Sequence, residues 1–267
     1  MPPVLFQDKS QDPIFKATHA GNIGDAINAL LYLKAYWEKT GRKTHLYLQT
    51  NVPCVYSVEH PLKNILMNDL MAKTLKPLFL EQPYIDAVTI SEQKPDVQWM
   101  NLNKFRELPI DYHMGLIQGW QQLCTDIALN PFEPWIKAEK QEKYRDKIVV
   151  ARVARLRSDY IDYRFLKEYE DKILYVGVPE ECLQFKQETA INCEYMTATC
   201  FKHLAAIFNS CKLFIGNSGF PFTLAESIKC PRVLETNSIC PCVYPLSSNG
   251  RIALFQAQFE AFIKEFL

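Results

Sequence analysis

One segment, residues 212–235, restricts the possible folds of this chain more than any other. It reads KLFIGNSGFPFTLAESIKCPRVLE: an apolar run, a turn of small residues at 216–219, a stretch of helical length, a proline and a second apolar run. This order predicts a buried strand, a turn, a helix and another strand. A helix that follows such a turn leaves backbone N–H groups without partners, and these groups and the helix dipole favour a bound anion. We therefore expect an α/β unit with an anion site at the start of this helix.

A second turn of the same kind occurs near the N-terminus. Residues 14–19 predict a strand, 20–25 a turn that contains Gly21 and Gly24, and 26–39 a helix. Between the two turns, short apolar runs alternate with segments of helical spacing, which indicates a mostly parallel sheet. One glycine-marked turn in each half predicts an α/β protein with two Rossmann-like domains that face a shared cleft.

The composition excludes few classes of function. The 267 residues carry 30 basic and 30 acidic side chains, so the chain lacks the basic excess of many nucleic-acid binders. A nucleic-acid partner is therefore possible but not favoured. No run approaches the roughly 20 apolar residues that span a bilayer, so we expect no transmembrane segment and a cytoplasmic location. The nine cysteines are scattered without a Cys-x-x-Cys pair, which favours reduced thiols and argues against a structural zinc site.

A boundary between two domains is predicted in the middle of the chain. Two prolines are followed there by the charged run 137–147. The next residues, 147–153, read KIVVARV, which is typical of a strand buried on both faces. The last segment, 251–267, carries its apolar residues on one side of a helix, so it must pack on another element. The predicted domains are 1–136 and 137–250, with 251–267 as a C-terminal helix.

Short motifs in both halves carry a resemblance to a known family. They are FIGNSG at 214–219, PFTLAE at 221–226, CPRV at 230–233, and the turn from Gly21 to Asp25, which reads GNIGD. In this order the motifs resemble GT-B glycosyltransferases, and within them the lipopolysaccharide heptosyltransferase-like family. The chain departs from the family pattern in three ways. Thr223 stands in place of a histidine, the aspartate of the turn is absent, and one extra residue separates Ser218 from Pro221. The resemblance therefore does not imply that the donor sugar is a heptose.

This resemblance implies a role for each domain. Residues 1–136 would form the acceptor-side domain and 137–250 the donor-binding domain, and the helix at 251–267 would cross back to the N-terminal domain. The implied activity is an inverting, metal-independent transfer of a sugar from a nucleotide sugar to a hydroxyl acceptor, such as a surface glycan or a lipopolysaccharide-like molecule. The sequence contains no Asp-x-Asp pair, so we expect no metal and no other cofactor. A helix N-terminus and basic side chains would instead stabilise the leaving diphosphate.

The candidate donor-binding residues lie where strands are predicted to end. Ligands of open α/β sheets bind at the carboxyl ends of strands, and arginine suits bidentate phosphate contacts. The candidates are Arg152, Arg155 and Arg157 after one strand, Gly216, Asn217, Ser218, Gly219 and Thr223 at the turn, and Glu226 on the next helix. By the resemblance, Glu226 binds hydroxyls of the donor's ribose or sugar. The alternative roles are solvent exposure for the charged residues and helix capping for Ser218 and Thr223.

The candidate acceptor-side residues surround the first glycine turn. By the resemblance, Asp25 is the general base that takes the proton of the acceptor hydroxyl. The residues expected beside it are Gly21, Asn22, Gly24, His19 and His113. Asp25 could instead cap the helix, because aspartate is favoured at the N-cap position. The histidines could equally have structural roles.

Three other functions compete with this interpretation. The chain could glycosylate a modified DNA base, as some phage enzymes do, or it could bind a nucleotide sugar without transferring it. A dinucleotide-dependent oxidoreductase is disfavoured, because residues 21–25 do not form Gly-x-Gly-x-x-Gly and no ribose-binding acid follows the second predicted strand.

Overall fold

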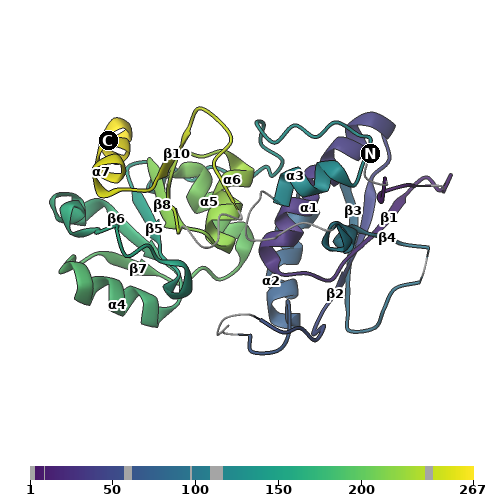
Figure 1. Ribbon diagram of the computed structural model, residues 1–267, viewed down its shortest axis with the longest axis horizontal. Helices are drawn as coiled ribbons and strands as arrows, with labels where there is room; N and C mark the ends of the chain where they lie inside the picture. Colours follow the sequence, from purple (N-terminus) through teal and green to yellow (C-terminus); the bar gives the residue numbers. More distant parts are fainter. Residues whose placement is uncertain (1–3, 9, 57–61, 97, 109–116, 238–242) are drawn as a thin grey trace. The chain divides into compact units, whose positions relative to one another are not determined.

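The computed structural model describes the chain except for residues 1–3, 9, 57–61, 97, 109–116 and 238–242 (Figure 1). It divides into two compact units. The first unit contains Met1–Pro131 and Trp135–Lys137, and the second contains Phe132–Pro134 and Ala138–Leu267.

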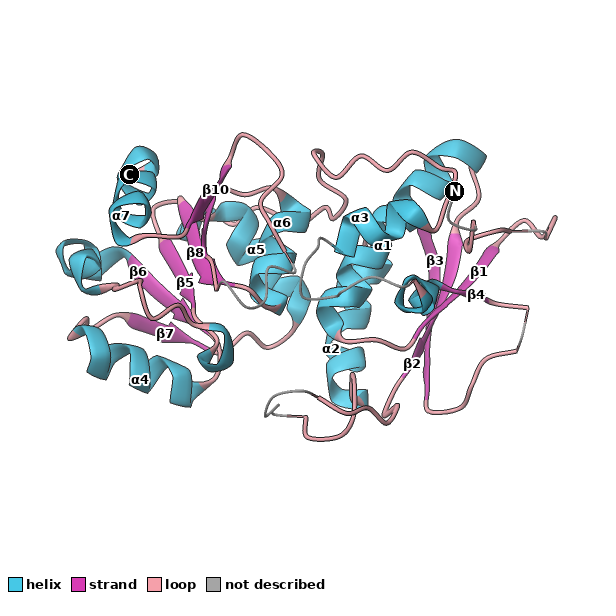
Figure 2. Cartoon of the chain, viewed as in Figure 1, coloured by secondary structure: helices cyan, strands magenta, loops and turns pink. Residues whose placement is uncertain are grey.

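The described strands of the first unit form a parallel sheet in the order β3-β2-β1-β4. The elements of this unit are β1 (Phe15–His19), α1 (Ile23–Thr40), β2 (Thr44–Gln49), α2 (Asp69–Leu80), β3 (Ile85–Ser91), β4 (Met100–Asn101), the 3₁₀ helix η1 (Leu102–Glu107) and α3 (Ile117–Leu123). Helices α1, α2 and α3 lie on one side of the sheet (Figure 2). On β1, Phe15 and Ala17 are buried while Lys16 between them is exposed, because successive side chains of a strand point to opposite faces.

The other face of this sheet is crossed by the connection from β3 to β4. Strand β4 lies beyond β1, so a right-handed crossover from β3 must pass over the face opposite α1 and α2. The described residues of this connection, within 92–99, form no helix. Trp99 packs edge-on against His45 and Tyr47. The centroid of its ring lies 4.9 Å from that of His45 and 5.4 Å from that of Tyr47. This face therefore carries polar and aromatic side chains of β1 and β2.

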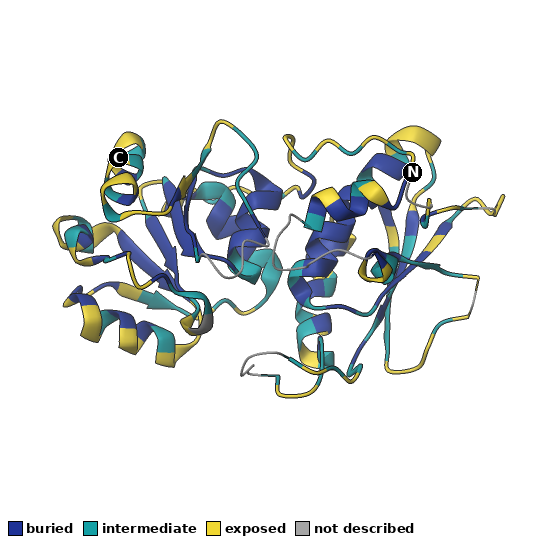
Figure 3. Ribbon diagram, in the orientation of Figure 1, coloured by how far each residue is buried: buried dark blue, intermediate teal, exposed yellow. Residues whose placement is uncertain are grey.

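The described strands of the second unit form a parallel sheet in the order β10-β9-β8-β5-β6-β7. The elements are β5 (Ile148–Ala151), β6 (Ile173–Val176), α4 (Pro179–Thr189), β7 (Glu194–Met196), α5 (Phe201–Ser210), β8 (Leu213–Asn217), α6 (Phe220–Ile228), β9 (Arg232–Glu235), β10 (Gly250–Ala253) and α7 (Gln256–Phe266). Strands β5, β6, β8 and β9 are buried along their whole length, as expected of a sheet covered on both faces (Figure 3). The strand order reverses between β5 and β8, which is where ligands of such sheets bind.

The C-terminal helix belongs to the second unit. Phe259 and Ile263 of α7 are fully buried in the core of this unit, and the rings of Phe259 and Tyr163 lie 4.9 Å apart. The Nζ atom of Lys212 donates a hydrogen bond of 2.6 Å to the carbonyl of Leu267. The expectation that residues 251–267 cross back to the N-terminal domain is therefore wrong. Strand β10 extends the second sheet and leads directly into α7, so the nearest apolar surface for this helix is the core of its own unit.

The predicted class, a mostly parallel α/β protein with two Rossmann-like sheets, is confirmed by the two sheet topologies. Among the helices in the described part of the chain, none is both long and apolar enough to cross a membrane.

Candidate functional site

The small-residue turn of the second unit lies at the carboxyl end of β8, beside the end of β5. At Gly216, a Cβ atom would come within 2.6 Å of the carbonyl oxygen of Ala151, so only glycine allows the two strands to approach this closely. The side-chain amide of Asn217 accepts a hydrogen bond from the N–H of Val153 and donates one to its carbonyl, both of 2.8 Å. Asn217 therefore joins the ends of β5 and β8 and has a structural role.

Helix α6 begins directly after this turn and presents an N-terminus at the switch point of the sheet. Gly219 is the N-cap, and its carbonyl accepts bonds from the N–H and the hydroxyl of Thr223, at 3.0 and 3.1 Å. Helix geometry leaves the N–H groups of Phe220 and Phe222 without intrahelical partners. Ser218 is fully buried, and its hydroxyl has no hydrogen-bond partner among the described residues. The turn thus combines an unused hydroxyl with unused backbone donors.

Arg152, at the end of β5, is already paired within the unit. Its Nε and Nη2 atoms donate to the two carboxylate oxygens of Glu235, at 2.8 and 2.9 Å. Glu235 is fully buried and also accepts bonds from the Ser158 N–H and the Tyr163 hydroxyl, at 2.6 and 2.9 Å. Burial lowers the pKa of Arg152, but the bonds to Glu235 outweigh this effect and the pKa lies above its ordinary value. This geometry favours a structural role over contact with a donor phosphate.

Arg157 has unused donors that Arg152 lacks. Its Nη1 atom bonds both carboxylate oxygens of Glu188, at 2.8 and 3.0 Å. Its Nε and Nη2 atoms are buried and have no partner in the described part of the chain. Its carbonyl accepts a bond of 2.8 Å from Asn237, which follows β9, so Arg157 lies at the carboxyl edge of the sheet. Arg155 lies in the 3₁₀ turn Ala154–Leu156, and its side chain is outside the described part of the structure.

Glu226 lies at the other end of the sheet, which corrects its predicted role. It is fully buried, pairs with Lys229, and accepts bonds from Arg232 Nε at 2.6 Å and from the Leu246 N–H at 3.2 Å. Arg232 is the first residue of β9, so this cluster occupies the amino edge of the strands. The reason is helix length, because α6 carries Glu226 back along the sheet and away from the turn. Burial lowers the pKa of Lys229 to about 8 although Glu226 opposes this shift.

The glycine turn of the first unit brings three predicted residues together. Asn22 is the N-cap of α1, so Asp25 is the third residue of the helix and not its cap. A Cβ atom at Gly21 would lie 2.7 Å from Cε1 of His19 and 3.1 Å from Oδ2 of Asp25, so both side chains surround this glycine. Asp25 is 6% exposed and its carboxylate forms an ion pair with Arg106 of η1. We call this group the Asp25 cluster: His19, Gly21, Asp25, Asn103 and Arg106.

Two polar atoms of the Asp25 cluster are buried without partners. His19 is fully buried, and its Nδ1 atom accepts a bond of 3.1 Å from the Gly21 N–H. Burial lowers the pKa of His19 to about 4, with Asp25 raising it and Arg106 lowering it, so the ring is neutral near pH 7. A neutral ring that accepts at Nδ1 carries its proton on Nε2, and this atom has no partner among the described residues. The Oδ1 atom of Asn103 also has no partner among the described residues. It lies 3.3 Å from the position that a Cβ atom would occupy at Gly21.

The remaining predicted acceptor-side residues contribute less. Asn22 accepts a bond of 2.9 Å from the Tyr56 hydroxyl, and Gly24 is the second residue of α1. His113 lies outside the described residues. Asn103 and Arg106 were not predicted from the sequence; they belong to η1, the segment after β4. No local pattern distinguishes these two residues, because only the pairing of β4 with β1 brings them to the glycine turn.

The fold is shared with solved glycosyltransferases. A glycosyl transferase family 9 protein from Veillonella parvula aligns with a TM-score of 0.57 and 13% identity over 97% of this chain and 93% of its own. The E. coli ADP-heptose lipopolysaccharide heptosyltransferase II aligns with a TM-score of 0.59 and 11% identity, over 94% of this chain and 98% of its own. E. coli heptosyltransferase WaaC, solved with ADP, aligns with a TM-score of 0.58 and 8% identity, over 94% of this chain and 99% of its own. The resemblance inferred from the motifs is therefore confirmed in the fold.

No protein-family model matches the chain, and no curated protein matches it significantly. Within the described residues, no group of three or more His, Cys, Asp or Glu side chains is arranged to hold a metal ion.

Proposed function

We propose that this protein is a metal-independent, inverting glycosyltransferase that moves a sugar from a nucleotide sugar to a hydroxyl acceptor. The observation that carries the proposal is the Asp25 cluster, in which a buried carboxylate lies beside two unpartnered polar atoms, within a fold shared by glycosyltransferases. The structures of the neighbours support a nucleotide-sugar donor, because WaaC was solved with ADP and heptosyltransferase II is described as using ADP-heptose.

In this proposal the Asp25 cluster holds and deprotonates the acceptor. The acceptor hydroxyl accepts a hydrogen bond from Nε2 of His19 and donates its proton toward Asp25. Arg106 pairs with Oδ2 of Asp25, and a carboxylate has about four lone-pair sites, so positions on Oδ1 are left for the proton. Asn103 supplies an acceptor for a second hydroxyl of the same substrate. The neutral state of His19 suits this role, since its Nε2–H donates without placing a positive charge beside the attacking oxygen.

The second unit holds the donor's diphosphate in this proposal. Anions bind favourably at helix N-termini, and α6 offers its first N–H groups together with the hydroxyl of Ser218. Arg157 adds its unpartnered Nε and Nη2 donors at the same sheet edge. As the acceptor oxygen bonds to the anomeric carbon, the bond from that carbon to the diphosphate breaks and its electron pair leaves with the nucleoside diphosphate. The single displacement inverts the anomeric configuration, and the acceptor proton passes to Asp25.

A nucleotide panel tests the proposal. Purified protein is heated with each nucleoside diphosphate and several nucleotide sugars, with and without EDTA, and release of nucleoside diphosphate is then measured with a panel of hydroxyl acceptors. A ligand at 100 times its Kd should add about 2.7 kcal/mol to the free energy of unfolding. We expect one nucleotide family to raise the melting temperature equally with and without EDTA. If no nucleotide shifts the melting temperature, the proposal is overturned. If EDTA removes the shift, the proposed metal independence is overturned.

One observation favours a second candidate, a nucleotide-sugar-binding protein without transferase activity. Arg106 pairs with Asp25 in this structure, so the carboxylate that would receive the acceptor's proton already has a partner within its own unit. Binding of a nucleotide sugar without turnover over a broad acceptor panel would support this candidate.

A further inference from the structure

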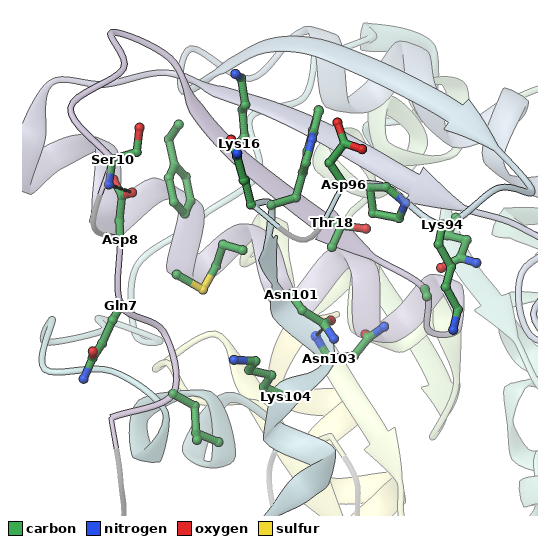
Figure 4. A pocket seen from close by; sticks show the side chains of 18 of the residues that line it. Gln7, Asp8, Ser10, Lys16, Thr18, Lys94, Asp96, Asn101, Asn103 and Lys104 are labelled. Atoms are coloured by element: carbon green, nitrogen blue, oxygen red, sulfur yellow. Dashed lines mark hydrogen bonds between the residues drawn. The ribbon is translucent and has the colours of Figure 1, made fainter.

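The buried cysteines of this chain have no part in the proposed reaction. Among the described residues, none of those that line the cavity of about 830 Å³ beside β1 and β4 is a cysteine (Figure 4). Cys211 and Cys230 lie instead in the core of the second unit, where they are 6% and 5% exposed, and both are free thiols. Two thiols that lie close together can form a disulfide, which a single buried thiol cannot.

The backbone brings these two cysteines together at the amino edge of the second sheet. Cys211 lies between the end of α5 and the start of β8, and Cys230 lies between the end of α6 and the start of β9. Strands β8 and β9 are parallel neighbours with Phe214 opposite Arg232, so the same register, continued back, brings Cys230 beside the residue that follows Cys211. The Phe214 N–H donates a bond of 2.9 Å to the carbonyl of Pro231, directly after Cys230. Paired strands lie about 4.8 Å apart, within the roughly 4.4–6.8 Å that separates the Cα atoms of a disulfide.

The two sulfur atoms lie beside the ends of neighbouring helices. The Sγ atom of Cys211 donates to the carbonyl of Phe208 at 3.3 Å, and the Sγ atom of Cys230 donates to the carbonyl of Ala225 at 3.8 Å. Phe208 belongs to α5 and Ala225 to α6, and these two helices pack against each other. The two thiols are also hydrogen-bonded to each other, and this contact together with burial raises the pKa of Cys211. Helices, strands and side chains therefore all place the two sulfur atoms within reach of each other.

A bond between these sulfur atoms would close a loop around one supersecondary unit. Residues 211–230 contain β8, the small-residue turn and α6. The bond would join the end of α5 to the end of α6 at the amino edge of the sheet, where Glu226 and Arg232 also lie. The turn at Gly216 lies at the opposite edge, so the α6 N-terminus would stay unobstructed. Cross-linking such a loop restricts the unfolded chain and so stabilises the fold.

We propose that Cys211 and Cys230 form a redox-active dithiol, which disulfides of low molecular mass, such as glutathione disulfide, oxidise to a disulfide that stabilises the second unit. This inference is independent of the proposed transfer activity. One cysteine, as its thiolate, attacks a sulfur of the small disulfide, so that a mixed disulfide forms and one small thiolate leaves. The thiolate of the other cysteine then attacks the cysteine sulfur of the mixed disulfide, and the second small thiolate leaves. The protons of the two cysteines pass to the two released thiols, so the protein loses two electrons and the small disulfide gains them.

The surroundings of the pair make this exchange slow. Only thiolates attack disulfides, and the raised pKa of Cys211 keeps its thiolate scarce. Both side chains are almost fully buried, so a small disulfide reaches them only when this edge of the unit opens locally. The pair therefore responds to a sustained change in the thiol–disulfide balance and not to a brief one.

Peptide mapping detects the bond directly. The folded protein is incubated with glutathione disulfide at about pH 8.5, near the ordinary pKa of a thiol, and the remaining thiols are then blocked by alkylation in denaturant. Trypsin releases Cys211 in residues 203–212 and Cys230 in residues 230–232, so the bond gives one linked peptide that dithiothreitol separates. We expect this peptide to form, and the melting temperature to rise by about 5 °C or more on oxidation and to return on reduction.

Variants show whether the rise comes from this pair. Cys211→Ala and Cys230→Ala should each lose the linked peptide and the rise in melting temperature. Cys124→Ala, at a buried cysteine of the first unit, should keep both. A cooperative melting curve under reducing conditions shows that each variant folds, and if one alanine variant does not fold, the other decides. The inference is overturned if the linked peptide does not form or forms only after denaturation, if mixed disulfides with glutathione accumulate instead, or if the melting temperature does not rise.

Discussion

The two glycine turns of this chain share a sequence pattern but differ in the state of their polar groups. Each turn ends a buried strand and begins a helix. Around the turn of the second unit, Asn217 and Arg152 are paired within the unit, and the side-chain atoms left without described partners can all donate: the Ser218 hydroxyl and the Nε and Nη2 atoms of Arg157. Around the turn of the first unit, His19 and Asn103 present buried atoms without partners among the described residues.

This difference shows what a small-residue turn can and cannot reveal. The turn marks where a strand meets a helix: Gly216 allows a close approach of the backbone, and Gly21 leaves room for the side chains of His19 and Asp25. Whether the site has free donors and acceptors depends on side chains from distant parts of the sequence, such as Glu235 in one unit and Asn103 in the other. Four predictions test this contrast, from the largest expected effect to the smallest.

The strongest test removes the carboxylate at the first turn. Asp25→Asn should lower the transfer rate by roughly 10²- to 10⁴-fold, the usual contribution of a general base. Binding of nucleoside diphosphate, measured by thermal shift, should stay unchanged because the proposed donor site lies in the other unit. Asp126→Asn, at an exposed carboxylate of the first unit, serves as the control. Normal turnover in Asp25→Asn would mean that Asp25 only stabilises the cluster.

The second test breaks the buried pair at the other turn. Arg152→Met leaves the buried Glu235 carboxylate uncompensated, which costs roughly 3–5 kcal/mol. The urea midpoint of the second unit, followed by circular dichroism, should fall accordingly, and Arg152→Met/Glu235→Leu should recover much of the loss. The control, Arg145→Met, breaks the exposed pair with Glu142 and should cost less than about 1 kcal/mol. An Arg152→Met protein that is stable but no longer binds nucleotide would make Arg152 a phosphate ligand after all.

The third test uses the histidine beside the first turn. The folded-state pKa of His19 is about 4 against 6.5 in the unfolded chain, so the unfolded state binds more protons between these values. The free energy of unfolding is therefore not reduced by His19 above pH 6.5. As the pH falls from 6.5 toward 4, it decreases by about 1.4 kcal/mol per pH unit, and by up to roughly 3 kcal/mol in total. His19→Gln should flatten this dependence in urea unfolding curves recorded from pH 7 to pH 4. An unchanged slope would place the neutral, buried ring in doubt.

The sequence predicted the architecture well because the apolar patterns that define it are local. Buried strands such as 148–151 and 213–217 are continuous apolar runs, and the glycine turns punctuate them. The site was harder to predict. Glu226 belongs to the right helix but lies at the wrong end of it, because two turns of helix carry it to the amino edge of the sheet. Asn103 and Arg106 are far from Asp25 in sequence and meet it only through strand pairing.

The smallest expected effect concerns the arginine that keeps unused donors at the second turn. Arg157→Met should raise the Kd for nucleoside diphosphate about tenfold, because hydrogen bonds to charged groups contribute about 1.5–3 kcal/mol and 1.4 kcal/mol is a factor of ten. Its partner Glu188 is 39% exposed and can be solvated, so stability should change little. Arg164→Met, at an exposed arginine of the same unit, is the control in calorimetric titrations. An Arg157→Met protein that binds nucleotide normally would leave the α6 N-terminus and Ser218 as the phosphate site. In that case neither of the two arginines with described side chains at the second turn would bind the donor, and the two turns would differ more in the residues that they use.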